Sequence, residues 1–498
     1  MKSRSFLIAK AVFLLSFIIT TIPFFANADS LNQIQNFNID STYDQLAREK
    51  IKATLIDISD RAYFYVENDY WLELSQSQRD GLIIKIKDLG AEFDNNIYPK
   101  LTKAYGSEWN PGIDNDSKIT ILFHLMGNDY AGYFKEKDQY YKQQFPESNE
   151  REMLYVNIHY LDKSIEKSYL SHEFAHLITF NQKNRILGVS EDTWITEMRS
   201  EYAPTIAGYN DQYLGSFLNI RVKRFLDDPS NPLTKWENDL NDYASINLFA
   251  HYFADHYGAD FFSKSLKSKT TDYKLFDEFL EQKGYNKKLS DVFIQWQIAN
   301  LINDCSSGGF FCYNNKNLSN IRITPRINFL PYTGESSLSV TDKIENWGAR
   351  WFKIVGGDGI FEFEFRGLKE LNFVVPFLLE KKDGGFLIGY LDIDETGTGK
   401  YRVQNFSQNY RAFYFIPMIL NDPMQKNGGF PYSWTATSKQ SQENPPVPEN
   451  PVPETSKQEQ IAKLQEQLEI LQQKLIELLK AKIIDLQAQL FRLQSQKR

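Results

Sequence analysis

The sequence is short of basic side chains, of cysteine and of long apolar runs. Its 56 Lys and Arg face 64 Asp and Glu, and this balance argues against nucleic acid as the main partner because phosphate binding needs surplus basic surface. Two cysteines are too few for a thiolate zinc site. Beyond the N-terminal region, no segment is apolar over the roughly 20 residues that a membrane span needs.

What the sequence does contain is enough for a large folded protein. Apolar residues make up 42% of the 498 positions and aromatic residues 15%, which excludes a wholly disordered chain and favours extensive sheet or large aromatic clusters. At roughly 150 residues per domain, this length predicts about three domains.

The first thirty residues have the pattern of a secretory signal peptide. A basic start precedes a mostly apolar run over residues 11–25, and Ala26-Asn27-Ala28 then provides a small-residue cleavage site. We predict a signal peptide at 1–28 that is removed before Asp29, with a retained membrane anchor as the alternative. The mature protein is therefore expected to be secreted and extracellular.

The predicted export determines how the two cysteines are interpreted. Cys305 and Cys312 lie close together in a stretch rich in Gly and Ser. In an oxidising compartment, such a pair most simply forms a disulfide that closes a small loop.

The order of periodicities predicts an α+β protein. Residues 29–325 show strand patterns, including 118–126 and 153–160, and are helical at 75–105 and from 165 to about 304. Short aromatic runs bounded by turns then predict an antiparallel β-sandwich at 326–436.

The C-terminal part differs in composition from the rest. Residues 437–456 are rich in Pro and predict an extended linker. Residues 457–498 carry apolar side chains at steps of 3 and 4 with one stutter, which predicts a coiled-coil helix. We expect this helix to form a homo-oligomer or to attach the protein to a cell surface; an isolated amphipathic helix lying on a partner is the alternative.

The chemistry is predicted by His172-Glu173-Phe174-Ala175-His176, a match to the H-E-x-x-H pattern. Residues four apart share one helix face, so His172 and His176 can bind one Zn²⁺ ion. Glu173 adjoins that face and is placed to act as general base on a water molecule that the metal activates. A surface or core helix with two unrelated histidines is the alternative.

The third ligand is expected downstream. Thr179 and Gln182 stand where a longer zinc-protease signature would need Gly and His, so a third histidine of that class is excluded. Glu197 lies 21 residues beyond His176, which leaves room for a return to a second helix and completes a His-His-Glu set with one open position. Glu201 shares the face of Glu197 and is predicted to orient His172 through its second ring nitrogen; a solvated surface acid is the alternative.

These residues resemble the gluzincins, the thermolysin-related zinc peptidases, and are most similar to the hyicolysin-type neutral metallopeptidases. Further likeness lies in Ala131-Gly-Tyr-Phe134, in residues 148–155 and in residues 243–258, and the resemblance covers roughly residues 50–300. It implies a catalytic domain with a mixed sheet and a helical lower half. It also implies the zinc ligands and the base assigned above. Met198 and Arg199 stand where that group often has Gly and Leu.

The resemblance also implies a donor for the oxyanion, because a Tyr or His downstream of the glutamate ligand serves in related gluzincins. Tyr243 is the first candidate and His251 and His256 are the next, while a buried aromatic residue at a helix start is the alternative for Tyr243. We interpret His124 and His159 as structural, although they are also candidates to flank the cleft.

Two acidic turns, one at Asp114 and Asp116 and one at Asp392 and Asp394, give only weak support for Ca²⁺. Val403 stands at the twelfth position of the second turn, where an EF-hand loop has Glu, so both are interpreted as plain turns.

The sequence thus predicts a secreted zinc metallopeptidase that cleaves peptide bonds within protein substrates. An exported zinc aminopeptidase is one alternative. A non-enzymatic surface adhesion or assembly protein with a structural metal site is the other.

Overall fold

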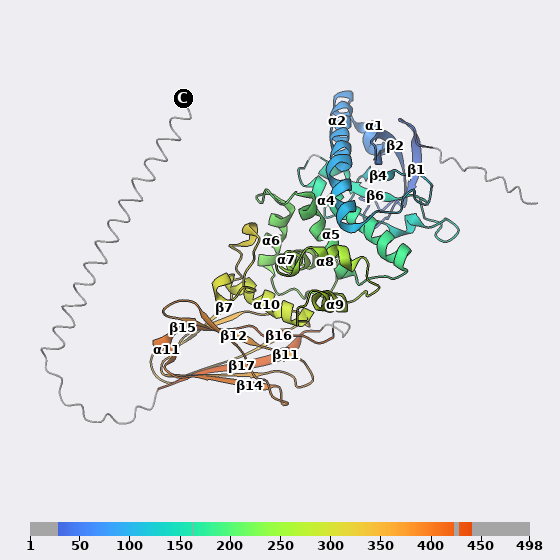
Figure 1. The fold of residues 1–498 in the computed structure, drawn as a ribbon. Coiled ribbons are helices and arrows are strands. Elements are labelled where there is room, and N and C mark those ends of the chain that lie inside the picture. The colour runs from blue at the N-terminus through green and yellow to red at the C-terminus, as the bar shows by residue number, and fades with distance from the viewer. Residues whose placement is uncertain (1–27, 162, 423–427, 441–498) are drawn as a thin grey trace, which may run out of the picture. The chain divides into compact units, whose positions relative to one another are not determined.

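The computed structural model describes residues 28–161, 163–422 and 428–440, which combine several β-sheets with helices (Figure 1). The predicted signal peptide up to residue 27, the predicted linker from residue 441 and the predicted helix at 457–498 lie outside the described residues. None of the described helices combines the length and the apolar character that crossing a membrane requires.

The first sheet has six strands in the order β1-β2-β3-β4-β6-β5. Its central strands β3, β4 and β6 are parallel and buried along their whole length, which explains their nearly continuous apolar sequences. β5 lies at the edge and pairs with β6 antiparallel. The strands are β1 (Ile34–Asn38), β2 (Lys50–Ile58), β3 (Ala62–Glu67), β4 (Ile119–His124), β5 (Gly132–Tyr133) and β6 (Met153–Asn157).

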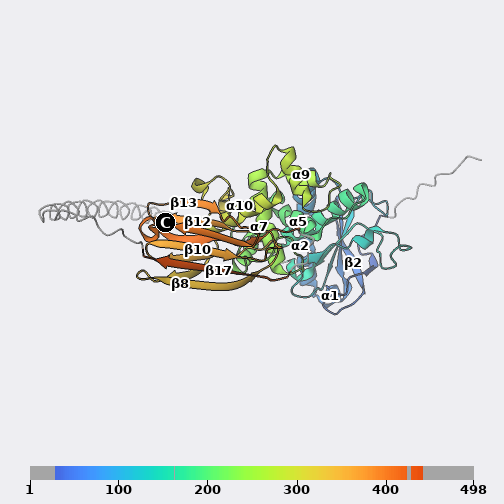
Figure 2. The ribbon, with the colours of Figure 1, turned by 90° about the horizontal axis from the view of Figure 1, so that it is seen from below.

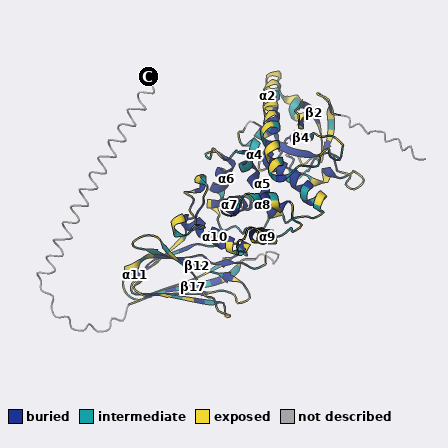
Figure 3. Cartoon of the chain, in the orientation of Figure 1, coloured by how far each residue is buried: buried dark blue, intermediate teal, exposed yellow. Residues whose placement is uncertain are grey.

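A long helical stretch packs against this sheet. Ser75 starts α2 with a capping box to Gln78, and Leu82, Ile86 and Leu89 form its buried face, whereas the outer face is exposed (Figure 3). The helix predicted at 75–105 is interrupted by a π-helical turn, η1. The elements are α1 (Asn68–Glu73), α2 (Gln76–Glu92), η1 (Phe93–Ile97) and α3 (Tyr98–Tyr105).

Helices make up the following part of the chain, and α5 packs against both α4 and α7 around a shared apolar core. The helix-rich segment predicted from residue 165 is therefore present. Its helices are α4 (Glu166–Thr179), η4 (Phe180–Leu187), α5 (Thr193–Ala207), α6 (Phe217–Asp227), α7 (Leu240–Tyr257), α8 (Asp260–Ser265), α9 (Lys274–Gln282) and α10 (Leu289–Ile302). Short 3-10 turns are η2 (Glu136–Gln139), η3 (Ile158–Tyr160), η5 (Cys305–Ser307) and η6 (Lys316–Leu318).

From β7 onward the chain is almost entirely β. A four-stranded sheet, β14-β10-β17-β8, and a five-stranded sheet, β13-β12-β15-β9-β7, form separate layers (Figure 1). Figure 2 shows β10, β17 and β8 of the four-stranded sheet from below. Aromatic side chains such as Phe363, Phe413 and Trp434 fill the core between them. The elements are β7 (Arg326–Leu330), β8 (Ser336–Ile344), β9 (Phe352–Gly356), β10 (Ile360–Arg366), β11 (Phe373–Val374), β12 (Pro376–Lys381), β13 (Phe386–Tyr390), β14 (Thr398–Val403), α11 (Phe406–Asn409), β15 (Tyr410–Phe415), β16 (Met418–Ile419) and β17 (Phe430–Lys439).

Three local features differ from, or add to, the sequence-based predictions. The linker does not begin at residue 437, because Thr437 still pairs with Glu362 of β10 within strand β17. His159 lies in the turn η3 rather than in a strand. The backbone N–H of His159 donates a hydrogen bond to the Asn157 side chain, which bends the chain at this point. Cys305 and Cys312 form a disulfide.

Candidate metal centre

Two neighbouring helices bring the predicted ligands together. His172 and His176 are one turn apart on α4, and α5 packs alongside with Glu197 facing them. The opposite side of α4 is held in the core by residues such as Phe174 and Leu177, which fixes the direction in which the imidazoles point.

The three ligand atoms form a small triangle. The Nε2 atoms of His172 and His176 are 3.1 Å apart, and Glu197 Oε2 lies 3.2 Å from the first and 3.3 Å from the second. A tetrahedral zinc ion with N and O ligands at about 2.0–2.2 Å holds its ligand atoms about 3.3–3.6 Å apart. Both the donor set and its spacing therefore suit one Zn²⁺ ion. Within the described ranges, no other set of three His, Cys, Asp or Glu side chains comes together in this way.

The electrostatic field at this point favours positive charge. Burial lowers the pKa of the His172 imidazole, but the Glu197 and Glu201 carboxylates outweigh burial and raise that pKa to about 10. Burial likewise opposes ionisation of Glu197, yet the two imidazoles hold its pKa well below the usual range. A site that stabilises positive charge so strongly is suited to a cation.

Behind the ligands lies a fully buried polar cluster. Glu201 Oε1 lies 3.4 Å from Nδ1 of His172, as the helical spacing predicts. Nε and Nη2 of Arg221 on α6 each donate a 2.8 Å hydrogen bond to Glu201, and Asn247 on α7 donates another at 3.1 Å. Burial raises the pKa of Glu201, but the Arg221 charge outweighs it and keeps the carboxyl ionised. The cluster thereby places an ionised carboxylate beside Nδ1 of His172, which favours the tautomer that carries its proton on that nitrogen.

Glu173 lines the cleft and is not one of the three residues whose ligand atoms cluster together. Burial is the main cause that raises the pKa of its carboxyl above the ordinary value. A Cβ atom on Gly132 would lie 2.7 Å from the Tyr155 carbonyl oxygen and 3.2 Å from Glu173 Cγ, so only glycine lets β5 pass this close to the carboxyl group. The carboxyl group thus lines the cleft beside the three candidate ligands, and its raised pKa is compatible with the predicted role of a general base.

Tyr243 also lines the cleft, with its ring centroid 6.2 Å from that of His172. Its hydroxyl donates a 2.8 Å hydrogen bond to Asn238 Oδ1, and burial together with the Glu197 and Glu173 charges raises its pKa well above the ordinary value. The phenol therefore keeps its proton and can act as a donor. The other candidates face elsewhere: His251 contacts Thr205 and the Asn247 carbonyl, and His256 contacts the Cys312 carbonyl.

The cleft has a volume of about 980 Å³ and is bordered on one side by the sheet edge and on the other by helices. The sheet side contributes residues 128–134, which include β5. The helical side contributes Ile220 and Arg224 of α6 and Leu240 of α7. The cleft thus lies between the sheet edge and the helices, and His172, His176 and Glu197 line it.

Several residues at this site escape the sequence-based predictions. Arg221 follows Glu201 by 20 positions and contacts it only through tertiary packing. The one feature of the sequence that could have indicated its role is its position as a basic residue on the buried face of an amphipathic helix. Tyr43 lines the cleft from the N-terminal segment, for which the sequence gives no indication. Arg199, beside the ligand Glu197, is fully buried and pairs with Glu191 at 3.0 Å.

The acidic turns are stabilised by their own side chains. Asp116 accepts hydrogen bonds from the Lys118 backbone and the Tyr63 hydroxyl, and Asp394 accepts them from the backbones of Thr396 and Thr398. Neither turn brings together three side-chain ligands in the described part of the chain. The structure thus adds no support for Ca²⁺.

Comparisons with known proteins leave the function open. No protein-family model matches this sequence, and no curated protein matches it. Among solved structures, 39 chains match. The pre-peptidase C-terminal domain of a Bacillus anthracis collagenase is 7% identical, with a TM-score of 0.16 over 23% of this chain and 96% of that one. The lysozyme inhibitor PliG of Aeromonas hydrophila is 13% identical, with a TM-score of 0.16 over 23% and 97%. Scores this low carry no argument.

Proposed function

We propose that this protein is a secreted zinc-dependent endopeptidase of gluzincin type, and that His172, His176 and Glu197 hold the metal. The observation that carries the proposal is the arrangement of three ligand atoms, 3.1–3.3 Å apart, beside a buried carboxyl group that is not one of them. A structural zinc site normally has four protein ligands and is closed, whereas a catalytic site keeps one position open.

A bound zinc ion would act as a Lewis acid and lower the pKa of a water molecule towards about 7. The chain's own residues then account for the proton movements. The Glu173 carboxylate takes a proton from the attacking water while the water oxygen forms a bond to the scissile carbonyl carbon. The same carboxyl group delivers that proton to the amide nitrogen as the C–N bond breaks.

Two further groups support this reaction. Tyr243 keeps its proton and is placed to donate a hydrogen bond to the developing oxyanion, once the hydroxyl leaves Asn238. The edge strand β5 offers unpaired backbone groups to an extended peptide, which would add to the sheet as a further strand. Both features suit a substrate that extends on either side of the cleaved bond.

The test is hydrolysis of casein by the zinc-loaded protein, with and without a chelator. We expect activity that is lost on chelation and restored by zinc, and about one zinc ion per chain by metal analysis. Bound zinc without hydrolysis of any protein substrate would contradict the assignment and favour a structural metal site in an adhesion or assembly protein.

An aminopeptidase is the second candidate, and one observation favours it. Asp129 and Glu136 line the cleft, and a carboxylate there is able to bind the free amine of a substrate. Peptides with a blocked N-terminus separate the two functions, because an endopeptidase cleaves them and an aminopeptidase does not.

A further inference from the structure

The segment at residues 40–48 contributes Tyr43 to the cleft wall. The backbone N–H of Gly127 donates to the Tyr43 carbonyl at 3.0 Å, and that of Gln45 donates to the Leu125 carbonyl at 3.1 Å. Asp40 is held in the same way, since its N–H donates to the Tyr133 hydroxyl at 3.1 Å. The segment thus covers the loop that leads from β4 to the edge strand β5.

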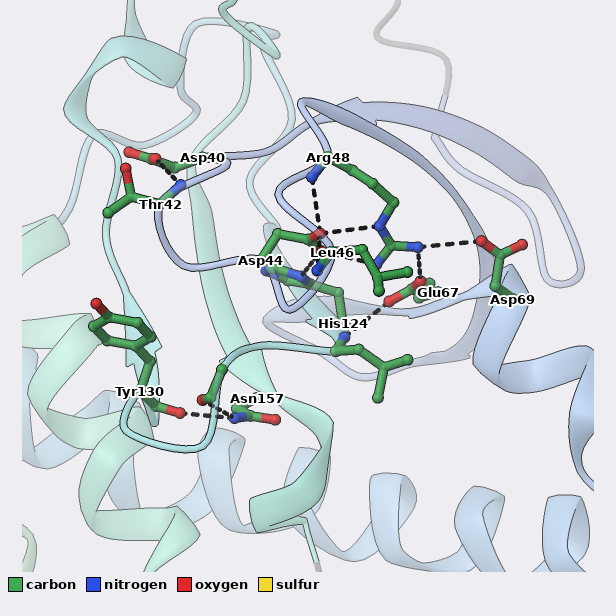
Figure 4. A network of polar contacts seen from close by, with 12 residues as sticks. Asp40, Thr42, Asp44, Leu46, Arg48, Glu67, Asp69, His124, Tyr130 and Asn157 are labelled. Atoms are coloured by element: carbon green, nitrogen blue, oxygen red, sulfur yellow. Dashed lines mark hydrogen bonds and ion pairs between the residues drawn. The ribbon is translucent and has the colours of Figure 1, made fainter.

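A buried ionic network holds this segment in place (Figure 4). Arg48 bonds both Asp44 and Glu67, and the second carboxylate oxygen of Glu67 accepts the Leu125 backbone N–H at 2.8 Å. His124, at the end of β4, lies 3.5 Å from Asp44. Burial opposes ionisation of Asp44, but the neighbouring His124 ring and the hydrogen bonds from Arg48 hold its pKa well below the usual range. Since Asp44 follows Tyr43 directly, the network fixes where Tyr43 enters the cleft.

The Tyr43 ring is held as firmly as its backbone. It stacks on Tyr133 of β5 with ring centroids 4.4 Å apart and an interplanar angle of 15°. Tyr130 meets it edge-on at 4.9 Å, and all three rings line the cleft. Within the described part of the chain, the Tyr43 hydroxyl takes part in no hydrogen bond that would occupy it.

The Tyr43 hydroxyl is suited to donate a hydrogen bond. Burial and the charges of Glu173 and Asp40 raise its pKa to about 12, so it keeps its proton at neutral pH. Tyr43 and the proposed base Glu173 line the same cleft. A fixed neutral donor in a cleft adds affinity with little loss of side-chain freedom on binding.

We propose that Tyr43 is a substrate-binding residue, whose hydroxyl donates a hydrogen bond to a backbone carbonyl of a peptide lying along β5. The inference rests on the proposed function, because it takes the occupant of the cleft to be a peptide. It assigns a role in substrate recognition to the N-terminal segment, and it makes Arg48, Asp44 and His124 positioning residues that act through Tyr43.

The test compares Tyr43→Phe with Leu46→Ala in the full-length, zinc-loaded protein. Tyr43→Phe removes only the hydroxyl and keeps the ring stacked on Tyr133. Leu46 lies on the same segment, is 68% exposed and does not line the cleft, so Leu46→Ala serves as the matched control. The probe is the hydroxamate of a blocked Gly-Leu dipeptide, whose binding is followed by calorimetry without any turnover.

We expect Tyr43→Phe to weaken binding of the hydroxamate about tenfold, and to raise KM for an N-blocked peptide by a similar factor while kcat changes less than twofold. Zinc content and melting temperature should stay at the wild-type values, and Leu46→Ala should behave as wild type in every assay. Equal hydroxamate affinity for wild type and Tyr43→Phe would overturn the inference.

The two measurements separate this inference from the proposed function. If the wild type binds the hydroxamate in a Tyr43-dependent manner but cleaves no peptide, the peptidase assignment fails and the role of Tyr43 stands. If the wild type cleaves peptides and Tyr43→Phe matches it in KM and in binding, the assignment stands and the role of Tyr43 fails.

Discussion

Replacing Arg221 by Met tests the buried cluster behind the metal ligands. The substitution removes two 2.8 Å hydrogen bonds to Glu201, a carboxylate that has no solvent exposure. Met fills much of the volume of the arginine stem, so the main loss is the charge that compensates Glu201. Breaking a buried ion pair by removing one partner costs about 3–5 kcal/mol. This is a large share of the roughly 5–15 kcal/mol that stabilises a typical folded domain.

The assay is urea unfolding of the metal-free protein, because bound zinc would add its own binding free energy to the measured stability. Lys223→Met is the control, since Lys223 lies on the same helix α6 but is exposed. We expect Arg221→Met to lower the free energy of unfolding by about 3–5 kcal/mol, and the control to change it by less than about 0.5 kcal/mol.

The double variant Glu201→Gln with Arg221→Met sharpens the test. Removing both charges leaves no unpaired ion in the core, so the double variant should be more stable than Arg221→Met alone. Its zinc affinity should still fall by about 10–100-fold, because the His172 ring loses the carboxylate that orients it. An Arg221→Met protein within about 1 kcal/mol of wild type would refute the reasoning.

Three further predictions address catalysis and pH. Glu173→Gln should keep zinc and lower kcat by about 10²–10⁴-fold, and wild-type turnover of casein would show that Glu173 is not the base. Tyr243→Phe should lower kcat by about 10²–10³-fold with little change in KM; a change confined to KM would instead indicate a role in binding. Burial raises the pKa of Glu152 from 4.5 to about 8, so the folded protein loses stability as pH rises through this window, where the unfolded chain ionises first. Glu152→Gln should therefore flatten urea stability between pH 5 and 8 and raise it by about 3 kcal/mol at pH 7, and an unchanged pH profile would contradict this.

The sequence predicts the candidate site well where helical spacing alone determines it. His172 and His176 are one turn apart, as are Glu197 and Glu201, so each pair must share a helix face once the helices form. The packing of α5 against α4 brings these two faces together, and it belongs to the tertiary structure. Only the spacing between the motifs and the likeness to gluzincins predict it. The alternation of aromatic and polar residues similarly predicts strands such as β10 before any pairing is known.

The rest of the site depends on contacts that sequence patterns do not encode. Residues 40–48 form no strand or helix, and their position comes from single hydrogen bonds and from the ionic network around Arg48. In the sequence alone, Arg48, Asp44 and Glu67 each look like an ordinary charged residue exposed to solvent. The linker predicted from residue 437 begins too early for a related reason. Thr437 still pairs within β17, and the Pro-rich composition begins only after that strand ends at Lys439.

Charge balance distinguishes a metal centre from a cluster of ion pairs. Glu173, Glu197 and Glu201 place three carboxylates around two imidazoles, and Arg221 compensates one of them. If both imidazoles are neutral, as metal ligands must be, the buried group carries a formal charge of −2. Such a charge is unfavourable in a buried site unless it is paired, and a single divalent cation neutralises it. Protons on the imidazoles would also balance the charge, by forming hydrogen bonds within the triangle. The three ligand atoms at 3.1–3.3 Å, with Glu173 outside the triangle, support the proposed divalent ion with an open position.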